Sequence, residues 1–142
     1  MKQDDPYNLQ RFVDAQAPVY EQVCAELRAG LKTSHWMWFI FPQIAGLGHS
    51  PMAQRFAISV RAEAVSYLQH PVLGPRLKEC TGLLNDVQGR SIEEILGGID
   101  ALKFRSSMTL FAKVAEDNAI FMTALNKFYG GQMDDMTGEA LS

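Results

Sequence analysis

Apolar residues recur along this chain mostly at the spacing of an α-helix. Val19, Val23 and Leu27 repeat every four residues, which places their side chains on one helical face. Similar stretches mark further helices, together with the cap residues Ser50 and Ser59 and the capping-box spacing of Ser91 and Glu94. The pattern predicts helices near residues 9–13, 19–29, 51–58, 60–69, 71–84, 92–96, 100–115 and 118–129.

The segment 100–115 carries two apolar stripes instead of one. Phe104, Met108 and Phe111 form the first stripe, and Leu110 and Val114 belong to a second about 100° away. A helix of this kind is buried on more than one side. We therefore expect an all-α single domain, residues 1–131, of about six to eight short helices around a central helix at about 100–115.

The last eleven residues, 132–142, follow Gly130-Gly131 and differ in composition from the rest. They contain the acidic residues Asp134, Asp135 and Glu139. Chain ends of this type are commonly mobile. The sequence predicts a flexible acidic C-terminal tail here.

Residues 34–43 form the most unusual segment, because they hold both tryptophans within a run of six apolar residues, 36–41. A run of this length suits a strand or a buried helix. Ser34 as a cap and the lack of a second strand candidate favour a helix. Two roles stay open. The aromatic residues form a core plug, or a tryptophan stacks on a planar ligand while His35 and Gln43 donate or accept hydrogen bonds.

The segment 100–109 places a cation beside hydroxyl groups. Lys103 lies three and four residues before Ser106 and Ser107, and Asp100 lies one turn before it. Three interpretations are open: an ion pair between Lys103 and Asp100, a binding site for a phosphate or carboxylate, or a Ser–Lys catalytic dyad. The loop 44–50 is either a connecting turn or a source of backbone amides for an anion.

Composition narrows the class of function. Hydrophobic residues make up 47% and charged residues 20%, which is typical of a folded protein. The 13 Lys and Arg against 16 Asp and Glu give a net charge of −3, which argues against nucleic-acid or anionic-membrane binding. The polar N-terminus and the two isolated cysteines, Cys24 and Cys80, favour a cytoplasmic protein with free thiols over a disulfide. No metal-ligand spacing and no cofactor motif is present, so we expect neither a metal nor a cofactor.

The string Ser34-His35-Trp36-Met37-Trp38-Phe39-Ile40-Phe41-Pro42-Gln43 resembles a bacterial family, domain of unknown function 1810, whose members are sometimes labelled calpastatin. The resemblance extends to residues 5–13, 46–48, 63–71 and 103–111, in order along nearly the whole chain. It implies a small, cytoplasmic, all-helical protein and supplies no catalytic residues. Residues 67–97 also look faintly like the ADP-ribose-linked, YbiA-like proteins, but the opening aromatic-Ser-Asn-aromatic motif of that family is missing.

The leading hypothesis is a pocket between segments 34–43 and 103–109 that binds a small anionic, nucleotide- or ADP-ribose-like ligand. The candidate binding residues are Ser34, His35, Trp36, Trp38, Gln43, Lys103, Arg105, Ser106 and Ser107. Hydrolysis of an N-glycosidic bond would use Glu63 or Asp100 as base. The alternative is a non-enzymatic interaction or scaffold domain with a purely structural aromatic core. The sequence leaves the oligomeric state open.

Overall fold

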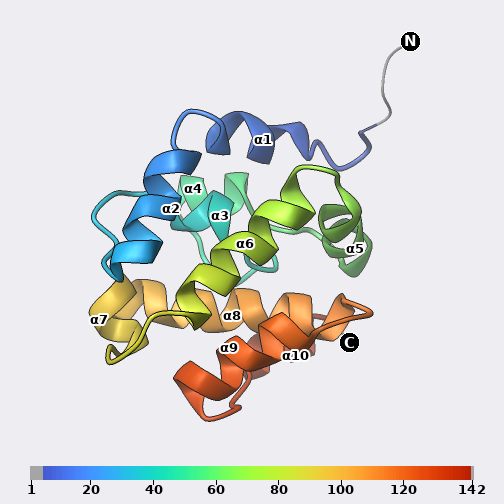
Figure 1. The fold of residues 1–142 in the computed structure, drawn as a ribbon. Helices are drawn as coiled ribbons and strands as arrows, with labels where there is room; N and C mark the ends of the chain where they lie inside the picture. The colour runs from blue at the N-terminus through green and yellow to red at the C-terminus, as the bar shows by residue number, and fades with distance from the viewer. Residues whose placement is uncertain (1–4, 142) are drawn as a thin grey trace.

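The computed structural model describes residues 5–141 and contains ten helices and no strand within them (Figure 1). The predicted all-α class is confirmed. The helices are α1 (Gln10–Gln16), α2 (Tyr20–Ala29), α3 (Met37–Ile40), α4 (Pro51–Arg55), α5 (Arg61–Gln69), α6 (Leu73–Asn85), α7 (Ile92–Leu96), α8 (Gly98–Val114), α9 (Ala119–Tyr129) and α10 (Asp135–Leu141).

Helix α8 is the centre of the packing, as its two apolar stripes predict. It contacts α3, α5, α7, α9 and α10, and Figure 1 shows it lying across the molecule with α9 and α10 on one side. Phe104, Met108, Leu110 and Phe111 are all fully buried. The surrounding helices therefore join one continuous hydrophobic core through α8.

Two of the predicted helix starts are confirmed. Ser91 and Glu94 form a capping box at α7, in which each side chain accepts a hydrogen bond from the other residue's backbone amide. The Ser50 hydroxyl accepts a hydrogen bond from the amide of Ala53 at the start of α4, before Pro51. Local capping chemistry thus sets these boundaries.

Two other predicted caps are wrong. Ser34 does not begin α3, whose first cap position is Trp36, and Ser59 does not begin α5, which starts after Val60. Both serines instead donate hydrogen bonds to buried carboxylates, Glu26 and Glu63. A hydrogen bond from a hydroxyl group stabilises a buried carboxylate more than it stabilises an exposed helix end. Each serine hydroxyl therefore binds the carboxylate and does not cap a helix.

The segment predicted as an acidic tail contains a helix. The carboxylate of Asp134, the residue before α10, accepts hydrogen bonds from the backbone amide and the hydroxyl of Thr137 in the first turn of that helix. The amide of Asp134 donates to the hydroxyl of Thr109 on α8 at 2.9 Å. Thr137 is fully buried, so α10 is attached to α8 by polar contacts that hydrophobic periodicity does not register.

The two cysteines are free and buried, as the sequence favours. Cys24 on α2 lies 3.9 Å from a carboxylate oxygen of Glu79, and Cys80 on α6 lies 3.8 Å from the hydroxyl of Tyr20. Burial raises the pKa of Cys80 to about 12, which keeps this thiol protonated. Both residues act as core side chains between α2 and α6.

The buried carboxylate of Glu26 on α2 fixes the loop that leads into α3. Glu26 is only 4% exposed. One oxygen accepts from the backbone amides of Thr33 and Ser34 at 2.7 and 3.1 Å and from the indole N–H of Trp36 at 3.0 Å. The other accepts from the Ser34 hydroxyl at 2.6 Å and from the Gln22 amide at 2.9 Å.

These five donors decide the charge state of Glu26. Burial by itself raises the pKa of this carboxyl group, but the hydrogen bonds from Ser34, Thr33, Gln22 and Trp36 outweigh that effect and lower the pKa to about 2. The ionised form is therefore favoured by folding. Relative to an ordinary glutamate, this contributes about 3 kcal/mol to the free energy of unfolding at neutral pH.

Replacement Glu26→Gln should lower the free energy of unfolding by about 3 kcal/mol at neutral pH, because the new amide group points its own hydrogens at some of the donors. A depressed pKa stabilises the fold above the unfolded-state pKa, and that stabilisation is lost as the pH falls from about 4.5 towards 2. The difference between wild type and variant should therefore shrink over that interval in urea unfolding experiments. The control is Glu21→Gln, at an exposed position on the same helix. If the difference in the free energy of unfolding between wild type and Glu26→Gln did not change with pH, the proposed role of the ionised Glu26 would be contradicted.

Candidate functional site

A cavity of about 460 Å³ lies where the segment after α3, the start of α8 and the start of α10 meet. Its volume is within the range typical of small-ligand sites. Trp38 and Gln43 line it on one side, Lys103 and Arg105 on another, and Asp134 on a third. The cavity is therefore built between the two segments that the sequence singled out, with α10 as an addition.

The loop between α3 and α4 lines the cavity and is fixed by backbone hydrogen bonds and close packing. A parallel bridge connects it to Ile58, whose amide donates to the carbonyl of Gln43 and whose carbonyl accepts from Ala45, both at 2.8 Å. Gly48 lies so close to α4 that a Cβ atom there would be 2.8 Å from the Cβ of Ala53. The glycine is thus required by this close approach, and the loop forms a fixed cavity wall.

Lys103 and Trp38 form a contact at the cavity wall. The ammonium nitrogen of Lys103 lies 4.5 Å from the centroid of the Trp38 ring, a cation–π distance, and 3.7 Å from a carboxylate oxygen of Asp100. The ion pair with Asp100, one of the three interpretations of this segment, is present. Asp100 also pairs with Lys32 at 3.0 Å, so it does not neutralise Lys103 alone.

Arg105 is incompletely paired. Its guanidinium group lies 3.9 Å from a carboxylate oxygen of Asp134, which is an ion pair beyond hydrogen-bonding distance. Its Nε atom is buried and has no hydrogen-bond partner among residues 5–141. Because the nearest carboxylate lies beyond hydrogen-bonding distance, the guanidinium group retains capacity for an external acceptor at the cavity.

The structure brings together five of the nine predicted binding residues. Those that line the cavity are Trp38, Gln43, Lys103, Arg105 and Ser106. The other four lie elsewhere. Ser34 and Trp36 bind Glu26, His35 is exposed and does not line this cavity, and Ser107 is fully buried inside the core. The aromatic segment is thus divided: Trp36 is 1% exposed and belongs to the core, whereas Trp38 belongs to the cavity wall.

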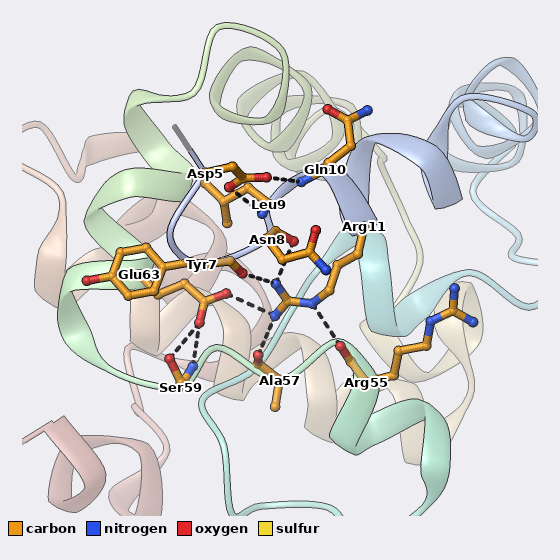
Figure 2. Close-up of polar contacts among 10 residues, drawn as sticks. All are labelled: Asp5, Tyr7, Asn8, Leu9, Gln10, Arg11, Arg55, Ala57, Ser59 and Glu63. Carbon is orange, nitrogen blue, oxygen red and sulfur yellow. Dashed lines mark hydrogen bonds and ion pairs between the residues drawn. The ribbon is translucent and has the colours of Figure 1, made fainter. Parts of the chain in front are cut away.

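The two carboxylates considered as catalytic bases do not line this cavity. Asp100 is held by Lys32 and Lys103. Glu63 is buried on α5, where it accepts hydrogen bonds from the amide and hydroxyl of Ser59 and pairs with Arg11 at 2.9 Å (Figure 2).

Arg11 uses all of its N–H groups within the protein. A guanidinium group has five, and the structure contains five hydrogen bonds from Arg11. The acceptors are the carbonyls of Tyr7, Asn8, Arg55 and Ala57 and the carboxylate of Glu63, at 2.6–2.9 Å (Figure 2). An open hollow of about 370 Å³ adjoins this cluster. Because no donor of Arg11 is free, the cluster is a clip that joins the N-terminal turn to the α4–α5 connection.

Replacement Arg11→Lys should lower the free energy of unfolding by about 3 kcal/mol, since an ammonium group has three donors and cannot reproduce the planar fork, which leaves Glu63 less satisfied. Thermal or urea unfolding measures the change. Arg28→Lys at an exposed position of α2 serves as the matched control. Equal stability of the two variants would rule out the proposed clip.

Sequence reasoning missed several cavity residues. Ile99, Leu102 and Met136 line it and are more than half exposed, and Asp134 fell within the predicted tail. The available signal was the position of Ile99 and Leu102 on the outer side of an otherwise buried helix. For Asp134 no local signal existed, because its partners Arg105 and Thr109 lie on α8.

Within residues 5–141, no group of three or more His, Cys, Asp or Glu side chains is arranged to hold a metal ion. No helix in that range combines the length and apolar composition needed to cross a membrane.

Comparison with known proteins places the chain in a family. No curated protein sequence matches it. The crystal structure of the conserved hypothetical protein Rv1873 from Mycobacterium tuberculosis is similar, with 60% sequence identity, a TM-score of 0.95, and coverage of 96% of this chain and 98% of that one. The family profile of the protein of unknown function DUF1810 matches residues 6–141. This match spans nearly the whole chain and confirms the resemblance, so the protein belongs to the DUF1810 family.

Proposed function

We propose that the protein binds a small anionic ligand with a planar ring, of the nucleotide- or ADP-ribose-like class, in the cavity between α3, α8 and α10. The observation that carries the proposal is Arg105, which lines a cavity of ligand size and whose nearest carboxylate, on Asp134, lies 3.9 Å away, beyond hydrogen-bonding distance. A carboxylate or phosphate oxygen of a ligand would accept a charge-assisted hydrogen bond from the guanidinium group.

The other cavity residues suit the same ligand. Lys103 adds a second cation within the same wall, and Trp38 offers an aromatic surface against which a ring can pack. Gln43 and Ser106 have polar side chains that can orient the ligand by hydrogen bonds. These roles keep five of the residues proposed from the sequence.

Neither of the two bases proposed from the sequence is placed for hydrolysis in this cavity. A general base has to reach the attacking water next to the ligand. Glu63 is engaged by Arg11 and Ser59, and Asp100 is engaged by Lys32 and Lys103, and neither lines the cavity. Glu63 and Asp100 are therefore better explained as structural ion-pair partners.

A protein-interaction domain is the second candidate. It is favoured by the exposure of Ile99, Leu102 and Met136 around the cavity, because exposed apolar clusters commonly mark contact surfaces. Failure of all anionic aromatic compounds to bind would favour this candidate.

A thermal-shift and calorimetric screen with AMP, cyclic AMP, NAD, ADP-ribose and aromatic carboxylates tests the first proposal. A ligand at 100 times its Kd should stabilise the fold by about 2.7 kcal/mol and raise the Tm by several degrees. For a compound that binds, Arg105→Gln and Lys103→Gln should each weaken binding about tenfold or more, because each removes a charged donor.

The control variant is Lys113→Gln, which removes an exposed lysine from the far end of the same helix. It should bind like wild type. No shift with any compound, or equal losses in all three variants, would exclude an anion site in this cavity.

A further inference from the structure

The mouth of the cavity is apolar although it is open to solvent. Five large hydrophobic residues are exposed in the described part of the chain, and three of them, Ile99, Leu102 and Met136, line this cavity. Their exposed fractions are 74%, 61% and 60%. The charged side chains that also line it, Lys103, Arg105 and Asp134, are each less than a third exposed.

On an ordinary protein surface the charged side chains are the most exposed ones. At this cavity the apolar side chains are more exposed than the charged ones. A ligand that fits it has its charge inside the cavity and an apolar body at the mouth. Water contact with the apolar side chains is then removed, which favours binding by roughly 25 cal/mol for each Å² covered.

The charges around the cavity nearly cancel. Lys103 and Arg105 face it, and Asp134 faces it with opposite sign. Asp100 and Lys32, which adjoin Lys103, cancel each other. With histidine neutral, these three cations and two carboxylates leave a single net positive charge. One negative charge on a ligand matches that excess, whereas a second has no cation to pair with.

Asp134 cannot move away from the site without loss of local structure. Its Oδ2 atom accepts both hydrogen bonds from Thr137 at the start of α10, while its Oδ1 atom faces Arg105. Its backbone amide is bound to Thr109 on α8. A fixed carboxylate beside the only incompletely paired arginine of the cavity repels any further negative charge brought there.

From these observations, and resting on the proposed function, we infer that the cavity selects, within that ligand class, singly charged anions that carry an aromatic body, and that Asp134 is the specificity-determining residue that rejects doubly charged members such as AMP and ADP-ribose. The shared chemistry is one carboxylate or phosphodiester charge next to an aromatic group. Cyclic nucleotides and aryl carboxylates both have this chemistry, and the probes below distinguish them.

Two series of probes with constant rings and stepwise charge test the inference by calorimetry at about pH 8, where a phosphate monoester carries two charges. The adenine series is adenosine, cyclic AMP and AMP. The naphthalene series is naphthalene methanol, naphthoate and naphthyl phosphate. In whichever series binds, the singly charged member should bind about tenfold tighter than the neutral and the doubly charged members.

The variant Asp134→Asn should raise the affinity for AMP or naphthyl phosphate about tenfold and change that for the singly charged probe less. The asparagine keeps an oxygen that accepts from Thr137. Glu139→Gln removes an exposed charge from the same helix outside the cavity and should leave the preference unchanged.

The outcomes separate the two claims. If no member of either series binds wild type, the proposed function fails and the inference fails with it. If probes bind but the doubly charged member is the tightest, or if Asp134→Asn leaves the preference as it was, the inference fails while the anion site remains.

The apolar mouth has its own test. Leu102→Gln should weaken binding of the singly charged probe several-fold and leave the Tm of the free protein nearly unchanged, because this side chain is already exposed. Leu31→Gln, at another exposed leucine away from the cavity, is the control. Unchanged affinity in Leu102→Gln would overturn the role of the apolar mouth.

Discussion

The buried carboxylate of Glu26 is the interaction on which the candidate site depends. A carboxylate that leaves water without partners is costly, so its five donors have to stay where they are. Three of these come from Thr33 and Ser34, and one is the indole of Trp36. The start of α3 is thereby fixed against α2, and Trp38 and Gln43, which follow within a few residues, become one wall of the cavity.

The opposite wall is α8, and a row of alternating rings and charges connects the two. Lys32 lies 5.1 Å from the ring of Trp36 and 3.0 Å from Asp100 on α8, and Asp100 lies 3.7 Å from Lys103, which contacts Trp38. Two of these contacts, Lys32 with Asp100 and Lys103 with Trp38, cross between segments. Rigid walls of this kind favour a site formed before its ligand arrives, which lowers the entropic cost of binding.

Features that depend on neighbours in sequence were predictable. The periodicity of α8 predicted its central place, and the Ser91–Glu94 spacing predicted a capping box. Hydrogen bonds and ion pairs between residues far apart in the sequence were not predictable, because the spacing of residues along the chain carries no information about such contacts. Glu26, the Arg11 clip and Asp134 all belong to this class, and for the same reason Ser34 and Ser59 were wrongly assigned as caps. Trp38, Gln43, Lys103, Arg105 and Ser106 therefore followed from the sequence, whereas Asp134 and Met136, which come from the segment at α10, required the fold.

Asp134 links the stability of α10 to the charge of the cavity. Its two oxygens have different partners, Thr137 on one side and Arg105 on the other, and the second contact is too long to be a hydrogen bond. A carboxylate without the hydrogen bonds from Thr137 would move towards the arginine and form a bidentate pair with it. The helix start prevents that movement, so Arg105 keeps unused donor capacity while its surroundings remain nearly neutral. A cation that is left partly unpaired by the demands of a neighbouring helix can accept one anionic group and resists a second.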